Sequence, residues 1–440
     1  MRWTIFFFTL TLLGADGELR LVTVDPAHFH AAQLHAAPMA GFSRDAWVYA
    51  PVGKDLVAHL NFIAGLKTRS LAPDHWRYHI YSGDDSFERM LKDRPGDVVV
   101  LSGRNTKTID YINRSLEAGL NVLADKPWII DVDQFPKLEQ ALDLAERKGI
   151  VAYDCMSQRF EIAYILQREL VNNREIFGEP IAGTPERPAV ETSNTHYLLK
   201  RFGGVVNLRP AAYFDIRQQG ESFADVGTHV VDLAHWILFP GQALDYRKDI
   251  QIVSARRWPT MLTLEQFRQV TGERDFPPYL QSDLHGGKLE YFTNNSVSYK
   301  VLGHYVKLQV AWDFESPSGA ADSIATTYRG TRSEVMARQS KLENHVPEVY
   351  VTPSGGDRAK VMAALEHKYP GRLQPESDGS IRIVIPPGQR RPDVEYFLLI
   401  ADKFAGYVRH PETLPKWEKA NMLAKYWITT QGVKAARSAK

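Results

Sequence analysis

An imidazole and two carboxylates stand close together in one stretch of the sequence, at His229, Asp225 and Asp232. Their spacing of four and three residues stacks the three side chains along one side of a helix. A neighbouring carboxylate favours the imidazolium form and can hold one tautomer, so His229 is suited to pass a proton near neutral pH. The pattern predicts an acid–base centre, with a surface helix carrying a solvated ladder of charges as the alternative.

The helix that carries these residues is predicted from its apolar positions. Val226, Val230, Leu233 and Ile237 recur at helical spacing. One face of this helix is therefore expected to pack inward, while the acid–base residues lie on a different side.

The composition limits the classes of protein that the chain can belong to. The chain has 440 residues, 44% of them hydrophobic, which predicts two globular domains. Lys and Arg number 53 against 52 for Asp and Glu, so the composition gives no general attraction to nucleic acid, and no such partner is expected. Cys155 is the only cysteine, which excludes an intramolecular disulfide and a Cys-rich zinc or iron–sulfur site.

The first residues have the order of an export signal. Met-Arg is followed by an apolar run over residues 3–13 and by the small residues Gly14 and Ala15. We expect this signal to cover residues 1–17 and the protein to be periplasmic or extracellular; an uncleaved anchor or a misassigned start would be the alternatives. No later apolar stretch approaches membrane length, so no integral span is expected after cleavage.

Short β-prone runs alternate with helical segments in the first part of the chain. The predicted strands are residues 19–24, 46–49, 98–102, 121–124 and 150–154, and the predicted helices are residues 26–37, 109–118 and 133–148. Asp25 is expected to cap the first helix, which Pro26 starts. This alternation predicts a doubly wound parallel sheet over residues 18–152, with ligands beyond the carboxyl ends of its strands.

The remainder, residues 153–440, predicts a second domain of the α+β class. Alternating β-prone runs at residues 288–292, 296–302, 305–314 and 322–328, with turns at Asn294-Asn295 and Gly303-His304, indicate an open, mainly antiparallel sheet. Closing helices are predicted at residues 358–368, 392–408 and 415–432.

Four segments together resemble one known superfamily in their order and spacing. They are residues 101–105, 111–119, 121–127 and 223–236. The Asp-Lys-Pro at residues 125–127 resembles a Glu-Lys-Pro motif, and residues 225–229 resemble an Asp-x-Gly-x-His motif. Both are motifs of the oxidoreductase superfamily named after glucose-fructose oxidoreductase, inositol dehydrogenase and MocA, whose first domain is Rossmann-like.

The resemblance implies an activity and a set of roles. It implies an oxidoreductase that acts on a CH–OH group of a sugar or sugar derivative with NAD or NADP, and that assembles into a homo-oligomer through the second sheet. It places Lys126 at the catalytic centre, with Asp225 and His229 orienting the substrate and transferring a proton. A hydroxyl that is being oxidised must lose a proton as hydride leaves, which such groups can accept. An exposed lysine in a turn is the alternative interpretation of Lys126.

Residues around the mouth of the first sheet are the candidates for cofactor contacts. They are His28, Phe29, His30, Asn105, Asp125, Lys126 and Arg159. Arg159 follows the last predicted strand of the first domain, and a structural ion pair is its alternative role.

The sequence departs from the superfamily where a dinucleotide is usually held. Residues 25–32 carry none of the three glycines that let the backbone approach a pyrophosphate, and residues 47–51 offer no carboxylate for the ribose. One interpretation keeps the dinucleotide in a different pocket. A second replaces it by a divalent metal on Asp25, His28 and His30, which would assist a carbohydrate lyase or a glycoside-cleaving enzyme. A third is a non-catalytic sugar-binding protein. An Asp25 helix cap with packed or exposed histidines would instead be purely structural.

A small-molecule or oligosaccharide substrate is expected to contact polar and aromatic residues that could line a carbohydrate cleft. The candidates are His196, Tyr197, Arg209, Tyr213 and Asp232. Aromatic faces stack on sugars and Arg pairs with carboxylates. Core packing is the alternative for the aromatic residues, and it is what we expect for Trp236 and Trp312.

Overall fold

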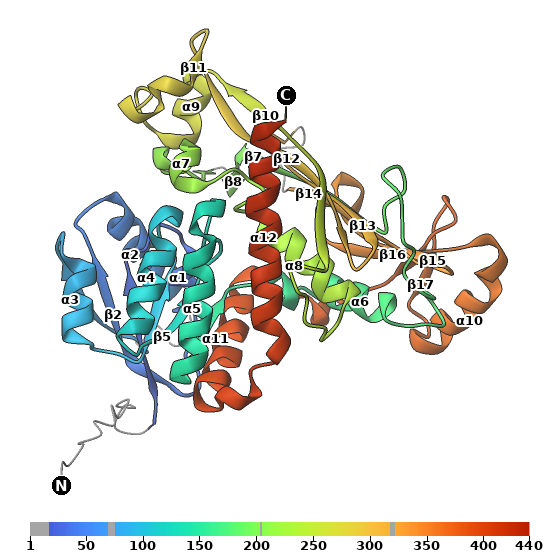
Figure 1. Ribbon diagram of the computed structural model, residues 1–440, viewed down its shortest axis with the longest axis horizontal. Coiled ribbons are helices and arrows are strands. Elements are labelled where there is room, and N and C mark those ends of the chain that lie inside the picture. Colours follow the sequence, from blue (N-terminus) through green and yellow to red (C-terminus); the bar gives the residue numbers. More distant parts are fainter. Residues whose placement is uncertain (1–16, 69–74, 203–204, 317–321, 440) are drawn as a thin grey trace. The chain divides into compact units, whose positions relative to one another are not determined.

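The computed structural model describes residues 17–68, 75–202, 205–316 and 322–439, which form two compact units (Figure 1). Unit one lies within residues 1–128, 139–155 and 397–414, and unit two within residues 129–138, 156–396 and 415–440. The sequence predicts a division near residue 152, yet residues 397–414 fold with unit one. The predicted export signal, residues 1–17, lies outside the described residues except for Gly17.

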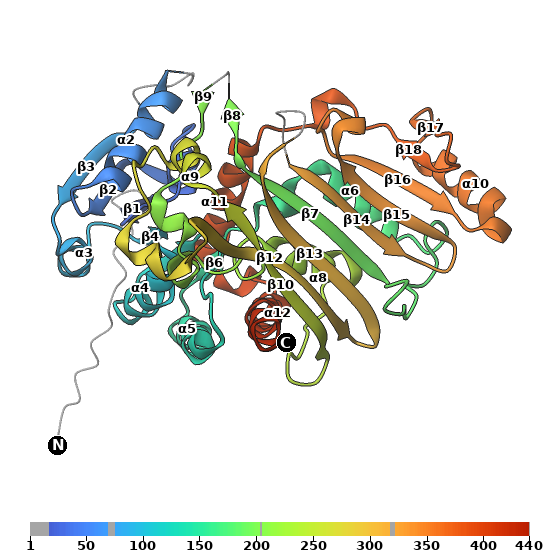
Figure 2. The ribbon, with the colours of Figure 1, turned by 90° about the horizontal axis from the view of Figure 1, so that it is seen from above.

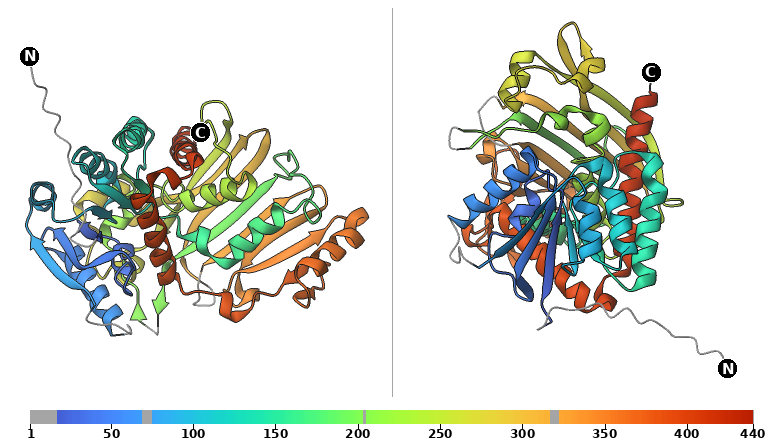
Figure 3. Two further views of the ribbon diagram at one scale, coloured as in Figure 1. Left: turned by 90° about the horizontal axis from the view of Figure 1, so that it is seen from below. Right: turned by 90° about the vertical axis from the view of Figure 1, so that its left-hand side faces the viewer.

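Unit one contains a six-stranded parallel sheet within the described part of the chain (Figures 1 and 3). Its strands, in spatial order, are β3 (Arg77–Ser82), β2 (Phe42–Ala50), β1 (Leu19–Val24), β4 (Val98–Leu101), β5 (Asn121–Ala124) and β6 (Ala152–Asp154). β4 and β5 are buried along their whole length, as expected for strands covered on both faces. The order 3-2-1-4-5-6 confirms the predicted doubly wound sheet.

Helices connect these strands and complete unit one. They are α1 (His30–Gln33), α2 (Lys54–Lys67), α3 (Ser86–Asp93), α4 (Asn105–Glu117), the later part of α5 (Phe135–Lys148) and most of α11 (Asp393–Arg409). α4 and α5 agree with the predicted helices to within a few residues.

The first helix is much shorter than its prediction over residues 26–37. The backbone amides of Ala27 and His28 both donate to the carbonyl oxygen of Ser102, at 3.0 and 2.9 Å, which keeps this segment in a loop. Asp25 has a positive φ of 43°, and no side-chain cap hydrogen bond is formed at the start of α1. The predicted Asp25 cap is therefore wrong, because long-range hydrogen bonds fix the loop that precedes the helix.

Two buried histidines, His35 and His59, lie in an aromatic cluster of unit one. The His35 ring centroid is 5.0 Å from that of Trp76, 5.3 Å from that of Tyr78 and 6.4 Å from that of His59. Among the described residues, the ring nitrogens of both histidines have no hydrogen-bond partner. Burial lowers the pKa of His35 to about 3, with a further contribution from His59, and lowers the pKa of His59 to about 4. Both imidazoles are therefore neutral in the folded protein at neutral pH.

Protonation of these histidines should make the protein less stable in acid. Their pKa in the unfolded chain is near 6.5, above the folded values, so unfolding takes up protons below about pH 6.5. The stabilisation is complete above that pH and should fall by up to about 1.4 kcal/mol per pH unit for each histidine as the pH drops towards 4. Urea unfolding at about pH 7.5, 6 and 5 measures this slope.

The variant His35→Leu isolates the contribution of one imidazole, because buried carboxylates also respond to acid. It should lose less stability than the wild type between neutral and acidic pH. His79→Gln, which removes a half-exposed imidazole on β3, should follow the wild type. An equal slope in the wild type and His35→Leu would contradict the assignment.

Unit two is built on a second sheet, with ten strands among the described residues (Figure 2). In spatial order they are β10 (Ile250–Leu262), β12 (Lys288–Val301), β13 (His304–Glu315), β7 (Val190–Leu199), β14 (Ser323–Arg329), β15 (Ser333–Gln339), β16 (Glu348–Pro353), β18 (Ile381–Ile383) and β17 (Leu373–Pro375), with β11 (Leu284–His285) beside β12. Only β13 and β7 pair in parallel, which confirms the mainly antiparallel prediction. The short strands β8 (Arg201–Phe202) and β9 (Val205–Val206) form a separate pair.

The turn predicted at Asn294 and Asn295 is wrong, because β12 continues through both residues. Their amide side chains are buried and hydrogen-bonded to residues far away in the sequence. Asn294 donates to the carbonyl oxygen of Trp258 at 3.1 Å and accepts from the backbone amide of Trp312 at 2.6 Å. Asn295 donates to the carboxylate of Glu221 at 2.8 Å. Two residues typical of turns are thus retained in a strand by side-chain hydrogen bonds that the local sequence does not reveal.

Several helices complete unit two, and α6, α8 and α12 pack against its sheet (Figure 2). The helices are α6 (Ile162–Val171), α7 (Ile216–Gln219), α8 (Gly227–Leu238), α9 (Leu264–Thr271), α10 (Arg358–Lys368) and α12 (Lys416–Ser438), with the first residues of α5 and α11. Every residue of α8 except Trp236 is buried. None of the helices in the described part of the chain has both the length and the apolar character needed to cross a bilayer.

Candidate active site

The carboxyl end of the sheet in unit one contains a topological switch point between β1 and β4. From these neighbouring strands the chain continues in opposite directions, to β2 and to β5, and ligands of such sheets bind where this happens. The loops after the two strands are joined by the hydrogen bonds from Ala27 and His28 to Ser102. A Cβ on Gly103 would stand 2.6 Å from the carbonyl oxygen of Asp25, so this close approach requires glycine.

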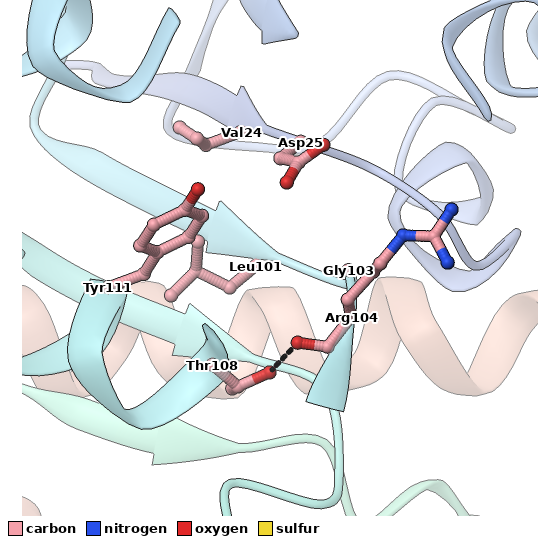
Figure 4. Close-up of a pocket in the computed structure, with 7 residues that line it drawn as sticks. All are labelled: Val24, Asp25, Leu101, Gly103, Arg104, Thr108 and Tyr111. Atoms are coloured by element: carbon pink, nitrogen blue, oxygen red, sulfur yellow. Dashed lines mark hydrogen bonds between the residues drawn. The ribbon is translucent and has the colours of Figure 1, made fainter. Parts of the chain in front are cut away.

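A small cavity lies beside the joined loops (Figure 4). It is lined by Val24, Asp25, Leu101, Gly103, Arg104, Thr108 and Tyr111. Burial raises the pKa of Asp25, and the positive charges of Lys107 and Arg104 oppose that shift. The Asp25 carboxylate is 3.9 Å from Nζ of Lys107, and Arg104 donates to Asp55 at 2.6 Å. The acid that the sequence assigns to a metal therefore lies near two cationic side chains and a second carboxylate.

Asp125, at the end of β5, is the centre of a compact polar cluster. Nδ1 of His28 and Nδ1 of His30 lie 3.0 and 2.9 Å from its Oδ2, and the Ser102 hydroxyl donates to the same oxygen at 3.0 Å. Although burial by itself raises the pKa of Asp125, His30 and His28 outweigh it and hold the pKa well below its ordinary value. Burial lowers the pKa of His30 to about 4, against the opposing charge of Asp125. Asp125, rather than Asp25, is the carboxylate beside the two imidazoles.

Three further residues predicted to contact a cofactor lie around this end of the sheet. Lys126 is partly buried, its backbone amide donates to Oδ1 of Asp125 at 2.9 Å, and its peptide bond with Pro127 is cis. Asn105 is the first residue of α4 and is buried. The Phe29 ring lies against the rings of His28 and His30 and is 41% exposed. Unit one thus gathers six of the seven predicted cofactor residues at or near its switch point.

The predicted acid–base residues of unit two are buried, so the alternative of a solvated surface helix is wrong. His229, Asp225 and Asp232 are 8%, 5% and 4% exposed. Asp225 accepts a hydrogen bond from Gln219 at 2.8 Å. Asp232 accepts two from Arg159, at 2.7 and 2.6 Å. The two carboxylates therefore have different hydrogen-bond partners, and His229 also contributes to lowering the pKa of Asp232.

Arg159 is the centre of a buried ion-pair network within unit two. Its guanidinium binds Asp232 on one side and Glu418 of α12 on the other, at 2.6 and 2.8 Å. Lys425 Nζ lies 3.7 Å from Asp232. Burial alone raises the pKa of Asp232, but Arg159 and Lys425 lower it below its ordinary value. The structural ion pair, which was the alternative role of Arg159, is what the structure shows.

The other predicted substrate residues gather around Trp312. The guanidinium of Arg209 lies 4.9 Å from the ring centroid of Tyr213 and 4.8 Å from that of Trp312. The His196 ring stacks on Trp312 at 4.7 Å. The Tyr197 side chain is buried, and its carbonyl oxygen accepts from Arg209 at 3.3 Å. Trp312 is buried as predicted, yet it organises this aromatic cluster.

Two tyrosines connect this cluster to Asp225. The Tyr291 hydroxyl donates to the carbonyl oxygen of Tyr213 at 3.3 Å. Burial raises the pKa of both tyrosines, and the negative charge of Asp225 adds to the effect. Asp225 and the aromatic cluster therefore belong to one polar region of unit two, which offers ring faces, a guanidinium and a carboxylate.

The sequence did not single out Ser102, Tyr291 or Asp322. Asp322 lies 2.7 Å from Nδ1 of His196 and accepts from Lys200 at 2.8 Å. Although burial alone raises its pKa, these two partners hold it below the ordinary value. Ser102 ends an apolar run, and that position at the mouth of the sheet is the only local signal that marks it.

Comparison with known proteins gives consistent similarities. The family described as putative oxidoreductase C-terminal domain matches residues 166–437. The crystal structure of a putative oxidoreductase from Parabacteroides merdae is 38% identical, with a TM-score of 0.91 over 96% of this chain and 98% of that chain. KijD10, a 3-ketoreductase from Actinomadura kijaniata in complex with NADP and TDP-benzene, shares the fold at 13% identity, with a TM-score of 0.56 over 95% of this chain and 98% of that chain.

One further relative matches only in part. The uncharacterized oxidoreductase YhhX from Escherichia coli (strain K12) is 28% identical over 123 residues, which are 27% of this chain. The match spans 33% of the length of that relative.

Proposed function

We propose that this chain is an NAD- or NADP-dependent oxidoreductase that acts on a CH–OH group of a sugar. The premise is that the chain belongs to the putative oxidoreductase C-terminal domain family and to the superfamily of glucose-fructose oxidoreductase, inositol dehydrogenase and MocA. The observation that carries the proposal is the position of Asp125 and Lys126. They follow β5 directly, next to the β1/β4 switch point of a parallel sheet, where such folds bind their ligands. The same fold in KijD10 is known with NADP.

The residues of unit one fit the nicotinamide end of such a cofactor better than its pyrophosphate. Asn105 begins the helix that follows β4, Lys126 follows the neighbouring strand β5, and both can position a bound ring. The loop after β1 has no glycine cradle, and its amides at Ala27 and His28 already donate to Ser102. A pyrophosphate would need side chains instead, among which we assign His28. When bound, a nicotinamide supplies hydride exchange with a carbon of the substrate.

We assign proton transfer to Lys126 and His229, each buried wholly or in part. Loss of water around such groups strengthens their interaction with a charge that develops on the substrate oxygen. Substrate contacts are assigned to the aromatic cluster of unit two and to Asp225, because ring faces suit the apolar faces of a sugar. Export and assembly of copies through the sheet of unit two remain predictions from the sequence.

A nucleotide inventory tests the proposed function. Purified protein is denatured, and the released nucleotide is separated by chromatography and quantified by absorbance. Protein without bound nucleotide is then titrated with NAD, NADH, NADP and NADPH, and binding is followed by calorimetry. We expect either co-purified nucleotide near one per chain or binding of one of the four. If no nucleotide is released and none binds, the redox proposal is wrong, and a lyase or hydrolase without a dinucleotide becomes the better hypothesis.

A further inference from the structure

Three side chains of unit one turn their ligand atoms towards one small volume. One ring nitrogen of His28, one of His30 and a carboxylate oxygen of Asp125 all lie within 4.8 Å of one another. They come from positions 95 and 97 residues apart, so only the folded sheet brings them together. Two imidazoles and one carboxylate form a common ligand set for a divalent transition metal.

We propose that His28, His30 and Asp125 form a binding site for a divalent metal ion of the zinc type. The proposal goes beyond the oxidoreductase function and does not depend on it.

The distances match hydrogen bonds and are also compatible with a metal site. An ion with bonds of about 2.0–2.1 Å holds adjacent tetrahedral ligands about 3.3 Å apart. The two imidazole nitrogens lie 3.0 and 2.9 Å from the same Oδ2 of Asp125, close to that separation. Both imidazoles and the Ser102 hydroxyl contact one oxygen of Asp125, Oδ2. The other oxygen, Oδ1, accepts a hydrogen bond from the Lys126 backbone amide.

The surroundings of the cluster hold its ligands in place. The Ser102 hydroxyl and the Lys126 amide bind the two oxygens of Asp125 and fix the carboxylate, as outer partners of metal ligands commonly do. The His30 ring packs on Phe397, with centroids 4.3 Å apart. Asp125 is 7% exposed and His30 17%, whereas His28 is 41% exposed. Asp125 and His30 therefore form the less exposed base of the site, and His28 leaves a path to solvent.

The donor set indicates which ions should bind. Imidazole and carboxylate ligands suit Zn²⁺ and also Mn²⁺, Fe²⁺ and Co²⁺, whereas Mg²⁺ and Ca²⁺ prefer oxygen ligands alone. Three protein ligands leave a fourth position for water or an anion, as in metal sites that remain open to small ligands. A metal ion at the switch point would place positive charge where related folds use a glycine-rich loop to bind a phosphate, and this chain lacks that loop.

Metal titration of the chelator-treated, tag-free full chain tests the proposal. ZnCl₂ is added in a calorimeter without nucleotide or sugar, and bound zinc is counted by elemental mass spectrometry after desalting. We expect one zinc per chain and a rise in the midpoint of thermal unfolding, since the site exists only in the folded protein. MgCl₂ should bind at least about tenfold more weakly than ZnCl₂.

Matched variants locate the binding. His28→Gln removes a partly exposed ligand with little risk to folding, and Asp125→Asn keeps the shape of a buried one. Each should weaken zinc binding by about a hundredfold or more, because loss of an outer partner alone usually costs about 10–100-fold. The control is His79→Gln, which removes an imidazole that pairs with Asp45 at 2.7 Å elsewhere in unit one. It should bind zinc as the wild type does.

Two results would overturn the metal site. One is wild-type protein that binds no zinc up to about millimolar concentration, which corresponds to a very weak interaction. The other is equal zinc affinity in His28→Gln and His79→Gln, which would place the bound ion elsewhere. If Asp125→Asn fails to fold, His28→Gln decides alone. Because nucleotide and sugar are absent, a failure here is separate from a failure of the oxidoreductase proposal.

Discussion

Replacement of Lys126 by Met should lower kcat by about 10²–10⁴-fold, the usual contribution of a positioned acid or base. Methionine keeps a flexible apolar chain of similar length but has no ammonium group. The contact of Lys126 with Asp125 runs through its backbone amide, which the substitution retains. The cluster at Asp125 should therefore remain intact while the proposed proton transfer is lost. Turnover is measured by nicotinamide absorbance with the nucleotide identified above and a panel of sugars and their oxidised forms.

A lysine outside the proposed site controls for the loss of one positive charge. Lys148 lies at the end of α5, where its ammonium group donates to the carbonyl oxygen of Glu117 at 2.7 Å. Lys148→Met should leave kcat within about twofold of the wild type, since surface substitutions away from functional features have small effects. Circular dichroism and the midpoint of thermal unfolding show whether both variants are folded. A folded Lys126→Met enzyme with more than a third of the wild-type kcat would remove Lys126 from the mechanism.

The architecture of unit one could be predicted because its elements are locally encoded. The fully apolar run at residues 98–101 and the mostly apolar run at residues 121–124 favour strands that are covered on both faces. The alternation of such runs with helices allows only a few sheet topologies, and right-handed crossovers reduce the choice further. The predicted and observed bounds of β1 and β5 are identical for this reason. In unit one, the local pattern of apolar residues is therefore enough to predict these strands.

Features set by contacts between distant residues could not be predicted in this way. α1 is short because a carbonyl oxygen on the β4 loop takes the amides of Ala27 and His28. β12 continues through Asn294 because neighbouring strands satisfy its amide. Local preferences favoured a longer helix and a turn, and long-range hydrogen bonds decided otherwise.

In the candidate site, too, some features follow from the local sequence and others depend on contacts between distant residues. The motif around residues 125–127 marks the end of a strand, and its place in the sheet follows from the local sequence. The sequence paired His28 and His30 with Asp25, the nearest carboxylate along the chain, whereas the fold brings Asp125 to them. Proximity in sequence is a poor guide at the mouth of a parallel sheet, because each strand end brings residues from a different part of the chain.

Replacement of His229 by Ala should lower kcat by about 10²–10⁴-fold, with a smaller effect on the amount of folded protein. His229 lies in the first turns of α8, where neighbouring residues are already buried and apolar or hydrogen-bonded. Alanine is the best helix former, so the helix itself should persist. The expected loss arises because alanine cannot take the proton from the substrate hydroxyl. Steady-state turnover measures the loss, with the concentration of folded enzyme determined from near-ultraviolet dichroism.

A second histidine on the same helix separates a catalytic role from a structural one. His235 is buried, and its Nε2 lies 3.2 Å from the hydroxyl of Tyr299. Burial lowers its pKa to about 4, despite the opposing charge of Asp232, so His235 is neutral and suited to packing rather than to proton transfer at neutral pH. His235→Gln should therefore destabilise the protein while kcat of the folded fraction stays within about threefold of the wild type. His229→Ala should show the reverse pattern, and added imidazole should restore part of its turnover by entering the space left by the side chain. A His229→Ala enzyme that is folded and retains a similar kcat to His235→Gln would show that α8 contributes packing alone.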